Sequence, residues 1–265
     1  MDPALRTAAS GMMAQQTRSE VSAHNLANVN TTGFKRSRAQ FEDLLYQTVQ
    51  GAAVIGQGDA QTHPAVQVGR GVRLTAVQRT HGQGSLERTD RQLDVAIEGD
   101  GFFQVQTGQG QLAYTRDGGF EISDGGVLVT SQGYTLQPTI RIPNDATSVT
   151  ISRTGVVSAT RGGAGNAALP EELGRVELAR FVNPAGLLAQ GENLYTPTAA
   201  SGEPVVGFPQ EDGMGRLVQG ALEMSNVEVV QEMVDMITTM RAYEINSKAI
   251  KNSEQMLEIA NNLVR

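Results

Sequence analysis

The chain has 265 residues, which is long enough for one large or two small domains with a buried core. Its net charge of -7 argues against a nucleic-acid partner, because sequence-independent binding needs clustered Lys and Arg. The absence of cysteine excludes disulfides, thiolate metal sites and cysteine nucleophiles. No apolar run reaches the roughly 18 residues of a membrane span or forms a signal-peptide core. We therefore expect no direct membrane insertion, and either retention in the cell or export without a cleaved signal.

Helix-breaking residues are confined to the middle of the chain. Of the 30 glycines, 28 lie from Gly51 to Gly220, and eight of the nine prolines lie from Pro64 to Pro209. The N-terminal segment instead opens with Asp2 as a helix cap and Pro3 at the first helical position. Apolar or small residues follow at helical spacing. This pattern predicts a helix over about 3–28, closed near Gly33.

The middle of the chain contains short runs in which apolar and polar residues alternate. These runs cover residues 101–106, 128–130, 134–136, 139–142 and 148–151, and Asp-Gly or Gln-Gly turn signals separate several of them. They predict an all-β region of short strands. Residues 47–71 differ, because they are rich in Gln, Gly, Ala and Thr. Their apolar residues follow neither the two-residue period of a strand nor the 3.6-residue period of a helix. We expect an extended arm or a long loop there.

The C-terminal segment has a clear predicted start. Ser225 and Glu228 have the spacing of a capping box, which predicts a helix over about 226–263. Its apolar stripe follows a heptad spacing with one phase shift. At 1.5 Å per residue such a helix extends roughly 55 Å, so it needs packing partners along its whole length.

Two interpretations fit a pair of terminal amphipathic helices. They can form a hairpin within one chain, or they can pack with the helices of neighbouring copies. The second is favoured because Gln15, Gln16 and Ser19 stand where the N-terminal helix needs apolar residues, so one helix pair buries too little apolar area. The predicted fold class is α+β, with long N- and C-terminal helices pairing as a coiled-coil-like axial domain around a central all-β region. The residues expected in the buried seam between subunits are Leu5, Met12, Leu26, Val230, Val234, Ile237, Ile245, Met256, Ile259 and Leu263.

No catalytic, cofactor-binding or metal-binding constellation is recognisable. His24, His63 and His81 are not at metal-ligand spacing. Two stretches, 108–113 and 163–168, formally fit a dinucleotide fingerprint, but neither opens a helix, so both are interpreted as turns. We expect no cofactor and no enzymatic activity.

Several motifs resemble those of a known family. They are Asn25-Leu-Ala-Asn28-Val-Asn-Thr-Thr-Gly33-Phe34-Lys35, Asp100-Gly-Phe-Phe103, Tyr114-Thr-Arg-Asp-Gly118 and Glu223-Met-Ser-Asn-Val227. They are similar to motifs of the bacterial flagellar basal-body rod family, and the resemblance covers nearly the whole chain. Within that family the chain is most similar to the distal-rod subunit, on residues 41–47, 68–72 and 191–195. A proximal-rod or hook paralogue is the alternative.

The resemblance implies a layered organisation. Residues 1–35 and 221–265 would form the axial domain, 36–95 and 205–220 an intermediate domain with an arm at 47–71, and 96–204 an outer β domain. It also implies a structural role: self-assembly into an open helical rod that transmits torque to the hook and forms part of the export channel. Asn25, Asn28, Gly33 and Phe34 carry the family signature. Asn25, Asn28 and Gly33 are expected to fix the exit of the first helix, by bonding free backbone groups or by adopting left-handed backbone.

The partners and the location follow from the same resemblance. They are further copies of the chain, proximal-rod and hook subunits, the surrounding ring proteins and the flagellar type III export apparatus, in a rod that spans the periplasm. Phe41 and Leu45 resemble an export-docking pattern, although a buried apolar pair is an equal alternative. Two other classes compete with the structural role: a peptidoglycan-cleaving enzyme, for which no carboxylate stands out, and a wall- or carbohydrate-binding β domain on a helical stalk.

Overall fold

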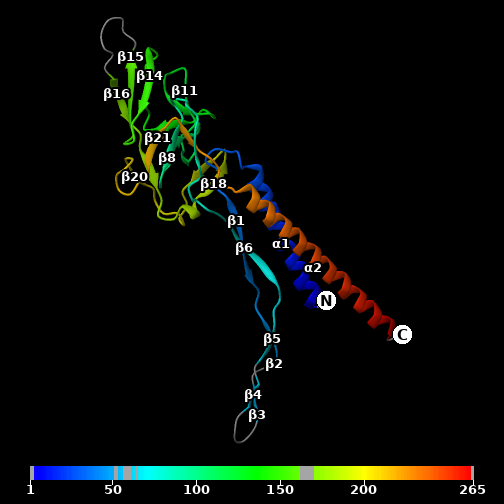
Figure 1. Cartoon of the computed structure of the whole chain (residues 1–265). Helices are drawn as coiled ribbons and strands as arrows, with labels where there is room; N and C mark the ends of the chain where they lie inside the picture. Colours follow the sequence, from blue (N-terminus) through cyan, green and yellow to red (C-terminus); the bar gives the residue numbers. More distant parts are fainter. Residues whose placement is uncertain (1–2, 51–52, 56–60, 64, 162–169, 264–265) are drawn as a thin grey trace. The chain divides into compact units, whose positions relative to one another are not determined.

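The computed structural model describes residues 3–50, 53–55, 61–63, 65–161 and 170–263 (Figure 1). The chain is α+β, with one helix near each end and many short strands between them. It divides into two compact units. Unit 1 contains Met1–Ala27, Ser37–Gln78 and Glu228–Arg265, and unit 2 contains Asn28–Arg36 and Arg79–Val227.

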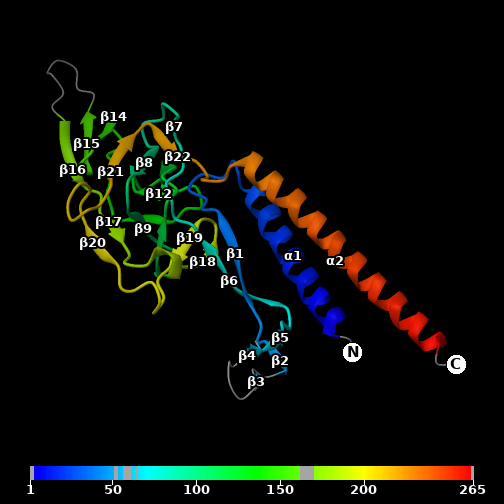
Figure 2. The ribbon, with the colours of Figure 1, turned by 60° about the horizontal axis from the view of Figure 1, so that its bottom comes forward.

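Two antiparallel helices dominate unit 1. They are α1 (Pro3–Ala27) and α2 (Val229–Leu263), and they run side by side in Figures 1 and 2. Arg18 on α1 forms an ion pair with Asp235 on α2 at 3.2 Å. The predicted first helix is thus confirmed to within one residue, while its predicted cap, Asp2, lies outside the described residues.

The second helix starts later than predicted. It begins at Val229, and the buried Ser225 hydroxyl has no hydrogen-bond partner, so the predicted capping box is wrong. The reason lies in the next residue. The Asn226 side chain accepts a hydrogen bond from Arg36 N at 2.7 Å and donates to the backbone oxygens of Thr80 and Gly82. These bonds hold the connection non-helical.

Unit 1 also contains three antiparallel strand pairs. They are β1 (Ser37–Asp43) with β6 (Val72–Arg79), β2 (Gln47–Gln50) with β5 (Val66–Val68), and β3 (Ala53–Ile55) with β4 (Gln61–His63). Within its described residues, the segment expected to be an extended arm or a long loop over 47–71 contains two of these antiparallel pairs, β2–β5 and β3–β4. All side chains of β2 and β5 are exposed, so no buried face imposes an alternating pattern on their sequence.

Unit 2 is built from short strands. Two pairs are β7 (Leu86–Arg88) with β22 (Ala221–Glu223) and β8 (Val95–Glu98) with β21 (Arg216–Gln219). A three-stranded sheet contains β14 (Ala146–Ile151), β15 (Val156–Arg161) and β16 (Pro170–Arg175). The nine-stranded sheet contains β9 (Phe102–Gln106), β10 (Leu112–Thr115), β11 (Phe120–Ile122), β12 (Leu128–Thr130), β13 (Thr135–Gln137), β17 (Leu178–Arg180), β18 (Leu188–Gly191), β19 (Leu194–Thr196) and β20 (Val205–Gly207). A short 3₁₀ helix, η1, covers Pro184–Gly186.

One predicted strand does not form. Residues 139–142 make only an isolated bridge between Arg141 and Val127. Ile142 N donates to Gly126 O, and Ile140 O accepts from Leu128 N, so this segment follows the β11–β12 hairpin without extending a ladder. Its alternating pattern is still meaningful, because Ile140 and Ile142 are both buried in the core.

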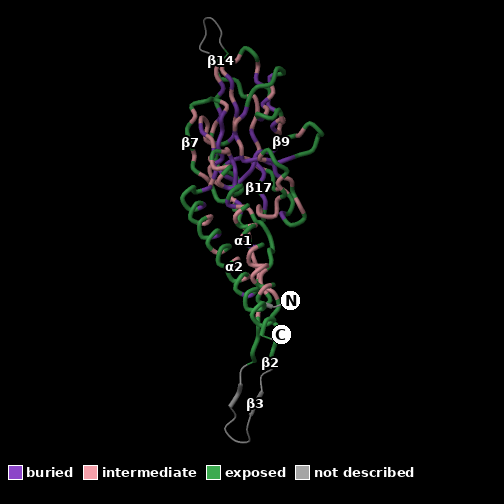
Figure 3. The backbone as a smooth tube through the Cα atoms, turned by 90° about the vertical axis from the view of Figure 1, so that its right-hand side faces the viewer, coloured by how far each residue is buried: buried purple, intermediate pink, exposed green. Residues whose placement is uncertain are grey.

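The main core lies in unit 2, where Figure 3 shows the buried stretches gathered in the strands. Phe103 and Phe120 meet edge to face at its centre, with ring centroids 5.1 Å apart. Val95 N donates to Gly118 O at 3.0 Å. A Cβ on Gly118 would lie only 1.7 Å from Val95 O, so no side chain fits there.

A buried carboxylate joins four segments of unit 2. Glu223 Oε1 accepts from Lys35 Nζ at 2.5 Å and from Gly84 N at 2.9 Å, and Oε2 accepts from Arg116 Nη1 at 3.3 Å. The Lys35 and Glu223 side chains are fully buried. Burial lowers the pKa of Lys35, and the Glu223 carboxylate opposes that shift. Since buried charges are tolerated only when paired, these groups depend on one another.

We expect Gly118→Ala to destabilise unit 2, since the new methyl group forces the backbone of Val95 to move. Overpacking of this kind costs about 1–3 kcal/mol or more. Gly125→Ala is the matched control, because a Cβ there has nothing within 4 Å, and its effect should stay within about 0.5 kcal/mol. Denaturant unfolding followed by circular dichroism measures both. Equal stability of the two variants would contradict the assigned packing.

We expect Glu223→Gln to cost about 3–5 kcal/mol, because it leaves two buried cations without a compensating charge. Glu98→Gln is the control: Glu98 forms an exposed bidentate pair with Arg216, and such pairs contribute about 0–1 kcal/mol. The midpoint of urea unfolding reports both. A Glu223→Gln variant as stable as Glu98→Gln would show that the buried cluster is not needed for the fold.

Candidate functional site

The signature residue Asn25 ties α1 to the strand that follows it. Its side chain is buried, its Oδ1 accepts from Ser37 N at 2.9 Å, and its Nδ2 donates to Ser37 O at 2.8 Å. The same amide lies 3.3 Å from Glu232 Oε1 in the first turn of α2. Asn25 therefore acts by bonding backbone groups, one of the two mechanisms expected from the sequence, and it does so from inside the helix.

The rest of the signature forms a turn in unit 2. Thr31 N donates to Asn28 O at 3.2 Å, and Gly33 N donates to Glu223 O at 2.7 Å. Gly33 has a φ of +67°, and a Cβ there would lie 2.8 Å from Asp117 N. Left-handed backbone is thus found at Gly33 and not at Asn28. Phe34 is buried.

The α2 residues predicted for the inter-subunit seam are exposed in the single chain. The exposed fractions of Val230, Val234, Ile237, Ile245, Met256, Ile259 and Leu263 range from 49% to 80%. The α1 residues of the same set, Leu5, Met12 and Leu26, are half-buried. One chain alone therefore does not bury this set.

The contact between the two helices is made largely by small and polar residues. The buried side chains of α2 within the described residues are those of Glu232, Thr239 and Ser253. At 100° per residue they lie roughly 140° around the helix from the exposed apolar stripe. Gly11 allows close approach, because a Cβ there would lie 2.9 Å from the Asn246 side chain. A groove of about 350 Å³ remains between Gln15, Gln16 and Ser19 on α1 and Met240 and Tyr243 on α2.

Further apolar side chains are exposed on β6 and on the connection between β1 and β2. Leu45, one of the two residues of the expected export-docking pattern, is 86% exposed, whereas Phe41 in β1 is half-buried. In the single chain, Phe41 and Leu45 therefore do not form a buried apolar pair. Tyr46, Leu74 and Val77 are also exposed.

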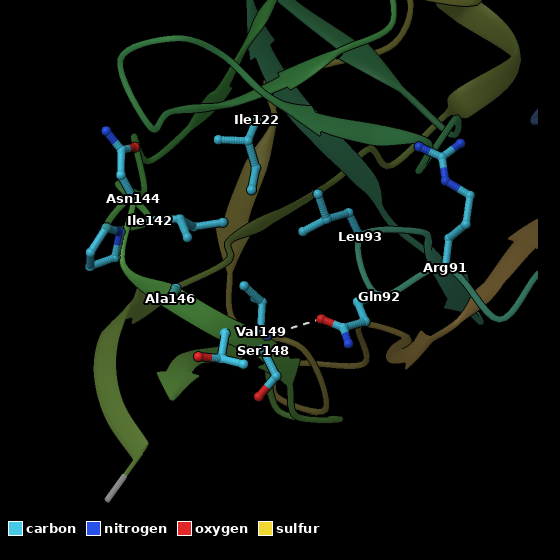
Figure 4. Close-up of a pocket in the computed structure, with 11 residues that line it drawn as sticks. Arg91, Gln92, Leu93, Ile122, Ile142, Asn144, Ala146, Ser148 and Val149 are labelled. Carbon is cyan, nitrogen blue, oxygen red and sulfur yellow. Dashed lines mark hydrogen bonds between the residues drawn. The ribbon is translucent and has the colours of Figure 1, made fainter. Parts of the chain in front are cut away.

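Two features of the described part of the chain are relevant to catalysis. No group of three or more His, Asp or Glu side chains in it could hold a metal ion. A cavity of about 480 Å³ in unit 2 is lined by Leu93, Ile122, Ile142 and their neighbours, with Gln92 bonded to Val149 N (Figure 4). Arg91 is the one ionisable group among its described lining residues, so it offers no acid and base pair. No described helix is long and apolar enough to cross a membrane.

The structure also locates the other sequence patterns. Residues 108–113 include the turn between β9 and β10, as expected, whereas 163–168 lie outside the described residues. Of the histidines, His24 is exposed on α1, His81 packs edge to face against Phe102 and Tyr195, and His63 belongs to β4. The Glu223 cluster was missed by sequence reasoning. Its signal was an isolated carboxylate in the apolar run Ala221–Glu223.

Comparison with known proteins supplies the family. Three family models match: Flagella basal body rod protein over residues 5–35, Flagellar hook protein FlgE/F/G D1 domain over 96–159, and Flagellar basal body rod FlgEFG protein C-terminal over 218–263. The first of these contains the signature turn, and the last contains α2.

Whole-chain relatives agree with the family models. The flagellar basal-body rod protein FlgG of Borreliella burgdorferi is 52% identical over 264 residues, covering 99% of this chain and 98% of the relative. The FlgG proteins of Buchnera aphidicola subsp. Acyrthosiphon pisum and Caulobacter vibrioides are 48% and 47% identical, over 97% and 98% of this chain and 98% of each relative. The family is structural, and the chain is not an enzyme. By its motifs, its terminal helices and these relatives, the chain belongs to the flagellar basal-body rod protein FlgG family.

Proposed function

We propose that this chain is a structural subunit of the distal rod of the bacterial flagellum, which polymerises, transmits torque to the hook and lines part of the export channel. The observation that carries the proposal is the exposed apolar stripe on α2. A 35-residue helix whose buried side chains within the described residues are polar, and whose apolar side chains are exposed, is incomplete as a single chain. Copies of the same chain supply what it lacks.

The helices of neighbouring subunits would bury the stripe in a coiled-coil-like packing. The contact must join two different surfaces of the chain, because a self-complementary contact closes into a dimer, whereas a head-to-tail contact with a suitable rotation grows into an open helix. The groove at Gln15 and Ser19 on α1 is a natural recipient, since it leaves space beside Met240 and Tyr243. The seam proposed from the sequence, Leu5, Met12 and Leu26 with the seven α2 residues, fits this role.

The remaining assignments follow from the same proposal. Residues 1–35 and 221–265 form the axial domain, 36–95 and 205–220 an intermediate domain, and 96–204 an outer β domain. The axial partners are proximal-rod and hook subunits, and the outer partners are the ring proteins around a rod that spans the periplasm. Export by the flagellar type III apparatus, without a cleaved signal, uses Phe41 and the exposed Leu45 as its docking pattern.

The exposed strands of unit 1 are proposed to stiffen the rod. A two-stranded ribbon is at best marginally stable in water, and β2 and β5 have every side chain exposed. Packing against neighbouring subunits would stabilise the ribbon and limit bending between them.

Ile245→Lys should abolish rod growth, because it places a charge in the proposed seam, while the helical content of the monomer stays unchanged, since Ile245 is 66% exposed there. Glu254→Lys is the control. It introduces a lysine on the same helix about 180° from Ile245. Sedimentation and electron microscopy measure assembly. Normal rods from Ile245→Lys, or equal loss of rods from both variants, would contradict the assigned seam.

Deletion of residues 51–66 should give rods that bend, with a shorter persistence length in electron micrographs, because the contacts of the arm between subunits are lost. Replacement of the same residues by a Gly/Ser sequence of equal length separates the effect of arm length from that of arm sequence. Straight rods from the deletion would show that the arm does not stiffen the assembly.

A further inference from the structure

Unit 2 contains a second cavity, of about 380 Å³, that combines apolar walls with charged groups. Phe102, Phe181 and Val205 form part of its wall. Arg116, Arg180, Asp100 and His81 also line it. The helix pair in unit 1 does not use this site, so its role is separate from the assembly proposed above.

Two buried polar atoms at this cavity have no hydrogen-bond partner. Arg116 is only 3% exposed, and its Nη1 and Nη2 donate to Glu223 Oε2 and Gly99 O, but its Nε has no acceptor. His81 Nδ1 is likewise buried and unpaired. Buried donors are almost always satisfied, and an unsatisfied one is costly. The cationic Arg116 side chain is therefore only partly compensated by the groups around it.

The charge around the cavity favours an anion. Burial is the main cause that lowers the pKa of His81 to about 4, and the charges of Lys35, Arg116 and Arg79 lower it further, so His81 is neutral near pH 7. Arg180 adds a fourth cation at the cavity wall. The carboxylates in contact with this group or lining the cavity are Glu223 and Asp100. This local excess of positive charge contrasts with the net charge of -7 of the chain.

The cavity adjoins an open sheet edge. Among the strands that the structure describes, β20 pairs with β17 alone, and its Val205 is directly opposite Arg180. Val205 and Val206 are both exposed, so both faces of this edge strand are uncovered. Val182, at the rim of the cavity, is 86% exposed. An exposed apolar edge strand is a template for an added strand.

We propose that β20 and this cavity form a docking site for an extended acidic segment of another protein. The segment adds as a strand along β20, and the carboxylate of one Asp or Glu side chain enters the cavity, whose wall includes Arg180 and Arg116. Its flanking apolar side chains cover Val182 and Val206. A peptide is the occupant because the open edge offers backbone groups that a free carboxylate cannot pair in register.

A peptide titration of the full-length chain, below the concentration at which it polymerises, tests the site. The probe is a blocked peptide of alternating Val and Thr with one central Glu, and the matched peptide has Gln in place of Glu. The Glu peptide should shift the NMR amide signals of Val205–Gly207 and bind about tenfold more tightly than the Gln peptide, because a charge-assisted bond is lost in the latter. Equal binding of the two peptides, or no shift at β20, would overturn the proposal.

Variants that keep the buried cluster intact extend the test. Arg180→Glu should weaken the Glu peptide about tenfold, and Asp100→Asn should strengthen it several-fold, since both residues are exposed and line the cavity. Arg161→Glu, at the end of β15 in the three-stranded sheet, should leave binding unchanged, because Arg161 does not line the cavity. If butyrate shifts the same amide signals as the Glu peptide, the cavity is a simple anion site, and the proposal that a strand adds along β20 is wrong. Rod assembly of the same variants should stay normal. A failure of rod assembly would contradict the proposed function and not the docking site.

Discussion

The fold of unit 2 depends on the burial of one carboxylate. Glu223 bonds to a lysine and an arginine that are far from it in sequence and to the backbone at Gly84. None of these charges can be buried alone, so the four segments must come together at once. Lys35 belongs to the signature turn, and Glu223 belongs to β22, the strand before α2. One ionic contact therefore fixes both segments that connect the β structure to the terminal helices.

The sequence predicted the elements whose apolar residues follow a regular period. Two long helices followed from the absence of breakers and from apolar spacing, and the short strands from alternation, because both patterns reflect burial on one side. It failed where the deciding contact was distant. The start of α2 depends on Asn226 bonding to residues near position 80, the 139–142 segment on a neighbouring hairpin, and the Glu223 cluster on partners more than 100 residues away. The strand pairing within the expected arm was not predicted for another reason, since β2 and β5 bury no side chain.

For the candidate site, the sequence predicted which α2 residues are apolar and on one face, and the single chain leaves them exposed. It did not predict that α1 and α2 contact each other through small and polar groups such as Thr239 and Ser253. In a helical hairpin that buries its own apolar residues, the apolar stripes of the two helices face each other. Here the arrangement is the reverse. In the assembly that we propose, contacts between chains would bury this stripe and stabilise α2 further.

The Asn25 side chain has a mechanical consequence. Its two bonds to Ser37, one to N and one to O, imitate a backbone strand pair at the junction between α1 and β1. A single hydrogen bond allows rotation about its own line, whereas two parallel bonds resist it. The junction therefore resists twisting, and a torque applied to α1 is transmitted to β1 with little loss. In a rotating shaft, that property matters as much as the strength of the joint.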